Sequence, residues 1–171
     1  MNNQSQNFWN FSLDLYSQAR VADACLDLQN SYGLDVNMLL FCYWHGVNLG
    51  EFPAKTLELA WGFSQTWKRE AVQPLRNVRR WMKEQANAHS TFNQPQFEAL
   101  RTRIKFDELA AEKYQQEFLE QIALARAEQP GGNKGPEACN SNLAKLFEIA
   151  GLENNDLIAI KLRTIAKALG K

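Results

Sequence analysis

The sequence predicts an all-α fold, an irregular multi-helix bundle of about six to eight helices. Apolar residues recur at spacings of three and four along most of the chain, as on one face of an α-helix. Alternating apolar and polar runs rich in Val, Ile and Thr, which would predict strands, are missing. Glycines, prolines and capping residues divide the 171 residues into segments of helical length.

The first two helices are predicted between the N-terminus and Gly33. Ser5 or Asn7 can cap the first helix, because their side chains can accept a hydrogen bond from a free backbone N–H. Gly33 can end the second helix in a left-handed conformation, with the apolar Leu34 behind it. The apolar faces are Phe8, Phe11 and Leu15 in the first helix, and Val21, Cys25 and Leu28 in the second.

The next helix, at about 36–49, is apolar on nearly every side, and Asp35 can cap its start. A helix that is apolar all round belongs in the centre of a bundle. We therefore predict that 36–49 is the buried central helix, and that Gly50 ends it.

Residues 54–88 are predicted as one bent helix or two helices. Pro74 has no backbone N–H, so it should kink or restart the helix there. A polar joint at 89–94 precedes a long helix at about 95–128, which we expect to run antiparallel to a neighbour.

The predicted domain organisation has three parts. Residues 1–128 form the main helical domain, and the segment QPGGNKGP at 129–136 is a flexible loop. Residues 137–171 form a helical hairpin that we expect to pack on the main domain.

Composition indicates a globular cytoplasmic protein. Apolar residues make up 45% and charged residues 22% of the chain, close to the globular average. The N-terminus lacks the basic and apolar regions of a signal peptide. The longest apolar run, 38–44, is far shorter than the roughly 20 residues of a membrane span. Three cysteines, an odd number, are typical of a reducing compartment.

The most informative surface lies on helix 67–85, which carries two stripes at helical spacing. The first stripe is apolar, and the second is offset from it by two residues, about 200° of rotation, so we expect it to face solvent. The apolar stripe is Trp67, Ala71, Leu75, Val78 and Met82. The residues predicted to bind an anionic surface are Arg69, Gln73, Arg76, Arg79, Arg80 and Lys83.

Two interpretations of the basic stripe stay open. It can be solvated, or paired within the molecule with the acidic helix that carries Glu108 and Glu112. Alternatively, it binds an acidic protein surface or, as a less favoured option, nucleic acid. The net charge of zero argues against bulk polyanion binding, although residues 51–105 have a net charge of +5.

Candidate chemistry is sparse, so we expect no catalytic residues, no metal and no cofactor. Cys42 and His45 share a helix face, but structural zinc normally needs four ligands. Asp23 and Asp27 could hold Mg²⁺ only with a second acidic motif, which is missing. A competing hypothesis is a small helical enzyme or ligand carrier, with a pocket lined by Cys42, Tyr43, His45 and Trp61.

Three segments carry a family resemblance: FWNFSLDLY at 8–16, CLDLQNSYGLDVNMLLFCYWHG at 25–46 and VQPLRNVRRWMK at 72–83. Over roughly residues 7–125 the chain resembles a family of small bacterial proteins that is catalogued as a domain of unknown function. The resemblance implies a bacterial, cytoplasmic, helical protein and no site residues. The basic stripe and the lack of paired catalytic groups lead us to predict a non-enzymatic binding or adaptor module.

Overall fold

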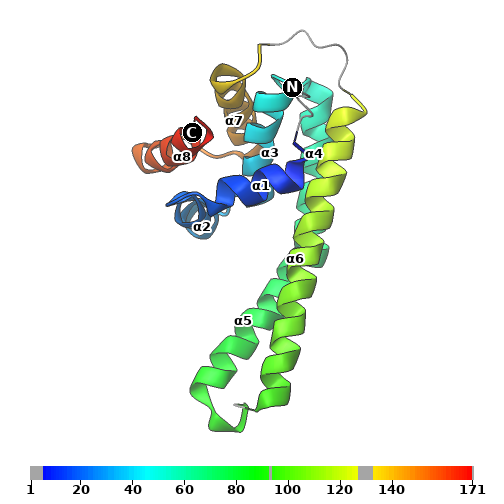
Figure 1. The fold of residues 1–171 in the computed structure, drawn as a ribbon, viewed down its shortest axis with the longest axis vertical. Helices are drawn as coiled ribbons and strands as arrows, with labels where there is room; N and C mark the ends of the chain where they lie inside the picture. Colours follow the sequence, from blue (N-terminus) through cyan, green and yellow to red (C-terminus); the bar gives the residue numbers. More distant parts are fainter. Residues whose placement is uncertain (1–5, 93, 127–132, 171) are drawn as a thin grey trace. The chain divides into compact units, whose positions relative to one another are not determined.

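The computed structural model describes residues 6–92, 94–126 and 133–170, and all regular structure in these ranges is helical (Figure 1). This confirms the predicted all-α class. The elements are α1 (Phe8–Ser17), α2 (Val21–Tyr32), α3 (Val36–Asn48), α4 (Ala54–Trp67), a π-helix (Lys68–Val72), α5 (Gln73–Ala88), a 3₁₀ turn (Ser90–Phe92), α6 (Pro95–Leu124), α7 (Pro136–Ala150) and α8 (Asp156–Leu169).

The chain forms two compact units. Unit 1 holds the described residues of 1–60 and 116–171, and unit 2 is 61–115. Helix α6 contributes residues to both units. Of the predicted loop at 129–136, residues 129–132 lie outside the described residues, and Pro136 begins α7.

Helix α3 is the centre of unit 1, as the sequence predicts. Every residue from Met38 to Gly46 is buried. Its aromatic side chains pack against neighbours on two sides, with ring centroids 5.4 Å apart between Phe8 and Trp44 and 5.2 Å apart between Phe41 and Phe52. A helix that is apolar all round is stable only when it is covered on every face.

The predicted end of α2 at Gly33 and the predicted start of α3 after Asp35 are confirmed, whereas α3 ends at Asn48, with Leu49 and not Gly50 as its C-cap. Gly33 has a φ of 67°, and its N–H donates to the carbonyl oxygen of Gln29. Asp35 accepts hydrogen bonds from the backbone N–H groups of Asn37, at 2.9 Å, and Met38, at 3.4 Å. Asn7 caps α1 by accepting from the N–H of Asn10, while the alternative cap, Ser5, lies outside the described residues.

Helix α7 packs tightly against the C-terminal half of α3. Gly46 makes this close approach feasible, because a Cβ added there would lie 2.6 Å from the backbone nitrogen of Cys139. The side chain of Asn142, fully buried, then joins the two segments. It donates to the carbonyl oxygens of Cys42 and Gly50, at 3.3 and 3.1 Å, and accepts from the N–H of Phe52 at 2.7 Å.

Pro74 restarts the helix in unit 2, as predicted. The turn before it is a π-helix, in which the N–H of Gln73 donates to the carbonyl oxygen of Lys68, five residues back. Such a wide turn inserts a residue and shifts the helical register. Val72 is consequently buried, with 3% of its surface exposed, whereas an uninterrupted helix predicts Ala71 there.

Within the described ranges, no helix combines the length and the hydrophobicity that crossing a membrane requires.

Candidate functional site

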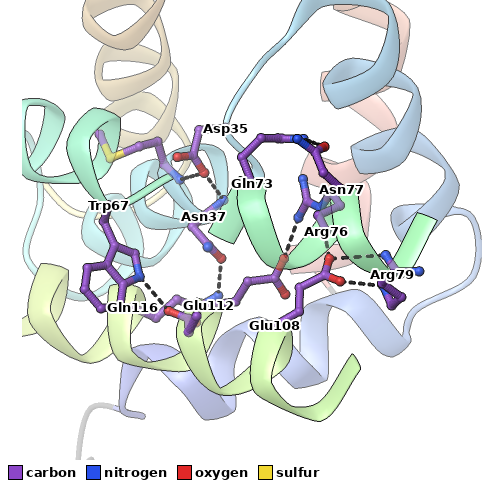
Figure 2. Close-up of polar contacts among 12 residues, drawn as sticks. Asp35, Asn37, Trp67, Gln73, Arg76, Asn77, Arg79, Glu108, Glu112 and Gln116 are labelled. Carbon is purple, nitrogen blue, oxygen red and sulfur yellow. Dashed lines mark hydrogen bonds and ion pairs between the residues drawn. The ribbon is translucent and has the colours of Figure 1, made fainter. Parts of the chain in front are cut away.

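The candidate site is the hairpin of α5 and the facing part of α6 in unit 2. Two of its arginines, Arg76 and Arg79, form ion pairs with carboxylates of α6 (Figure 2). Arg76 donates through Nε to Glu108 at 2.9 Å and through a terminal nitrogen to Glu112 at 2.6 Å. Arg79 also donates to Glu108, through Nε to one oxygen and through a terminal nitrogen to the other. Glu108 therefore bridges two guanidinium groups.

This network is largely shielded from water. The side chains of Arg76 and Glu108 are 13% and 8% exposed, and that of Arg79 is 29% exposed. Burial alone would raise the pKa of Glu108, but the hydrogen bonds and charges of Arg79 and Arg76 together outweigh it. The pKa of Glu108 is therefore lower than its usual value.

The expectation that Arg76 faces solvent is wrong, and internal pairing, which the sequence left open, holds for Arg76 and Arg79. Helical spacing gives the direction in which a side chain leaves the backbone. A long arginine on the flank of a helix can still bend toward a neighbouring helix and bury its stem. The two carboxylates on α6 provide the partner.

The other residues of the predicted basic stripe stay at the surface. Arg80 and Lys83 are exposed, and neither has an ion-pair partner among the residues that the structure describes. Arg69 is exposed, and in the part of the chain that the structure describes it pairs only with its sequence neighbour Glu70. Gln73 donates to the side chain of Asn77. The structure thus divides the stripe into buried arginines and exposed cations.

Helix α6 adds residues to this surface that sequence reasoning missed. On α5, Lys83 directly follows the buried Met82, and on α6, Leu109 directly follows the buried Glu108. Each exposed residue therefore lies about 100° around its helix from the buried residue before it. The contacts from Arg76 to Glu108 and Glu112 place these two flanks on the same side of the hairpin. Lys105, three residues before Glu108, also lies on this flank of α6, and Phe106 lies at its outer edge, about 160° around the helix from Glu108. Both residues are exposed. Only the pairing of the two helices shows this, because Lys105 is 22 residues from Lys83.

We define the basic side of the hairpin as Arg80, Lys83, Lys105, Phe106 and Leu109. Phe106 is 65% exposed and Leu109 is 46% exposed. The surface therefore combines three cations with two exposed apolar side chains.

The predicted pocket residues belong to both units. Cys42, Tyr43 and His45 are buried in unit 1, whereas Trp61 belongs to unit 2. The Cys42 thiol donates to the carbonyl oxygen of Asn142, and the Tyr43 hydroxyl donates to that of Leu162. The polar atoms of these side chains are thus used to hold α3 in the core.

His45 has a structural partner as well. Its Nδ1 lies 2.8 Å from the carbonyl oxygen of Gly50, and because a carbonyl only accepts, Nδ1 carries the proton. Burial lowers the pKa of His45 more strongly than this hydrogen bond raises it. The imidazole is therefore neutral at pH 7 and braces the turn after α3.

The cysteines are unsuited to nucleophilic chemistry, because the thiolate is the reactive form. Burial raises the pKa of Cys25 to about 12 and that of Cys139 to about 11, and it also raises the pKa of Cys42. In the described part of the chain, no three His, Cys, Asp or Glu side chains are grouped so that they could hold a metal ion.

Comparisons with known proteins give a family and no activity. A model of the family described as "Protein of unknown function (DUF2390)" matches residues 7–119, more than half of the chain. No curated protein and no solved structure matches. The matched segment ends before α7 and α8, which complete the core around α3. The chain belongs to the DUF2390 family.

Proposed function

We propose that this protein is a non-enzymatic binding module that docks an acidic protein surface on the basic side of its α5–α6 hairpin. One observation supports the proposal above all: the internal carboxylates are used by Arg76 and Arg79, so that Arg80 and Lys83 stay exposed without a partner in the described chain. Gln73 lies seven residues before Arg80, on the same face of α5, and Arg69 lies in the π-helix that precedes α5.

The apolar residues favour a protein partner over nucleic acid. Protein interfaces are rich in arginine and aromatic residues around a desolvated centre. Phe106 and Leu109 can supply that centre, with Arg80, Lys83 and Lys105 around it. Nucleic-acid surfaces depend on many phosphate contacts, and three exposed cations provide few.

In this proposal the buried arginines have a different task. Arg76 and Arg79 fix α5 against α6 through Glu108, which presets the spacing between the cations of the two helices. A preorganised surface loses less conformational entropy on binding.

We also propose that the protein works in the bacterial cytoplasm. The three free cysteines, all buried, support a reducing compartment.

The test compares capture of partners from a lysate of the source cells by the full chain and by a double variant, Arg80→Glu with Lys83→Glu. Charge reversal should lower capture of a specific acidic protein at least about tenfold, because like charges then face each other. Arg163→Glu, an exposed cation in unit 1, is the matched control and should leave capture unchanged.

Two results would count against the proposal. The first is a set of partners that survives the Arg80 and Lys83 reversal intact. The second is capture that is restricted to nucleic acid and that disappears on nuclease treatment, with affinity falling steeply as salt rises.

A further inference from the structure

The side of the hairpin opposite the basic side carries a stripe on α6 that has no role in the proposed function. Its members step by 4, 3, 4, 3 and 4 residues, the spacing of a coiled-coil seam. All of them are exposed, and all lie in unit 2. They are Gln96, Leu100, Arg103, Asp107, Ala110 and Tyr114.

This stripe is distinct from the face of α6 that packs on α5. Asp107 precedes the buried Glu108, so it lies about 100° around α6 on the flank opposite Leu109. Leu100 and Tyr114 are 48% and 47% exposed. The ring of Tyr114 packs on that of Trp67, with the centroids 4.7 Å apart, so the C-terminal end of the stripe is partly covered within the chain. From Leu100 to Ala110 the stripe keeps its helical periodicity around a large, half-exposed apolar side chain, as on a helix face that packs on another helix.

Helix α5 contributes to the same side. Trp81 precedes the buried Met82, so it lies on the flank opposite Lys83, and it is 51% exposed. Its indole ring lies edge-on to Phe92, with the centroids 6.3 Å apart. Val78, one turn earlier, is 45% exposed. Leu100, Val78 and Trp81 therefore leave apolar surface exposed on this side of the hairpin.

The order of residues along the stripe makes it complementary to itself. If a second α6 lies antiparallel, with a twofold axis between Arg103 and Asp107, then Arg103 faces Asp107 of the second copy. Leu100 then meets the small Ala110, and Gln96 meets Tyr114. The two charged positions sum to zero, whereas the basic side would repel its own copy. A twofold interface requires this self-complementarity.

We propose that the protein forms a symmetric dimer in which the Gln96–Tyr114 stripes of two copies pair antiparallel. The two hairpins then form a four-helix bundle, with Trp81 of each copy covering the new seam. Both basic sides stay exposed in this arrangement. The inference is independent of the proposed function, because it uses the opposite side of the hairpin and another partner.

Sedimentation equilibrium of the purified full chain tests the dimer by charge exchange. Arg103→Asp and Asp107→Arg each turn two attractive pairs across the axis into repulsive ones. Each should raise the dimer dissociation constant about tenfold. The double variant Arg103→Asp with Asp107→Arg restores opposite charges and should restore the wild-type constant. Lys105→Glu, on the basic side, is the control and should not change it.

A wild-type chain that is monomeric at every concentration would overturn the dimer. So would single reversals that leave the dissociation constant unchanged, or a double variant that is no tighter than the single ones while its helical circular dichroism is that of the wild type. As a second measurement, Leu100→Cys with Ala110→Cys should give a cross-linked dimer under mild oxidation, and its failure to cross-link would contradict the antiparallel register.

Discussion

Replacing Glu108 with alanine should lower the free energy of unfolding by about 3 kcal/mol, because it leaves two part-buried guanidinium groups without their shared carboxylate. Glu112 can still accept from Arg76, but Arg79 has no other ion-pair partner among the residues that the structure describes. Urea denaturation measures the loss. Glu84→Gln, an exposed carboxylate on α5, is the control and should change the stability by less than about 0.5 kcal/mol.

The ion pairs of Glu108 with Arg76 and Arg79 also predict that the stability of the protein depends on pH. Because the pKa of Glu108 is lower in the folded chain than in the unfolded chain, its contribution is complete above the unfolded pKa. The contribution is lost as the pH falls through the folded pKa, so the wild type should lose more stability than the Glu108→Ala variant below about pH 4.3. Parallel stability curves for the two proteins across this acidic range would contradict the account.

Replacing Asn142 with alanine should cost about 3 kcal/mol, because the buried N–H of Phe52 loses its acceptor while the carbonyl oxygens of Cys42 and Gly50 each lose a donor. The cost arises where α7 joins α3 and the turn at Gly50–Phe52. Asn140→Ala, an exposed position on the same helix, should be close to neutral. Thermal or urea denaturation compares the two variants with the wild type.

A near-neutral Asn142→Ala variant would show that α7 is held by apolar contacts alone. The expected large loss would mean that α3 depends on a helix outside the segment that the family model matches. The core of unit 1 would then need the C-terminal part of this chain.

Local signals predicted the helix ends. Gly33 and Asp35 act through their own backbone conformation and their own side chain, so their roles follow from neighbouring residues. Pro74 lacks an N–H wherever it stands, so the restart could also be predicted. The π-helix before it could not, because it adjoins a contact with a distant segment, in which the indole N–H of Trp67 donates to the carbonyl oxygen of Ala111 on α6.

The site was harder to predict, because it depends on contacts between distant segments. Arg76 and Arg80 look alike in sequence, and only the position of Glu108 on α6 separates them. Lys105 could not be assigned to the basic side of the hairpin for the same reason, because it lies on α6 and not on α5. Cys42 and His45 share a helix face as expected, but each is bonded to a carbonyl oxygen from a different segment.

The central claim is that α5 carries two kinds of arginine, those paired with carboxylates of α6 and those exposed to solvent. The most direct measurement is the unfolding free energy of Arg76→Met and of Arg80→Met under identical conditions. We predict a loss of about 2 kcal/mol or more for Arg76→Met, and less than about 0.5 kcal/mol for Arg80→Met. Equal losses for the two variants, or a larger loss for Arg80→Met, would contradict the division between buried and exposed cations.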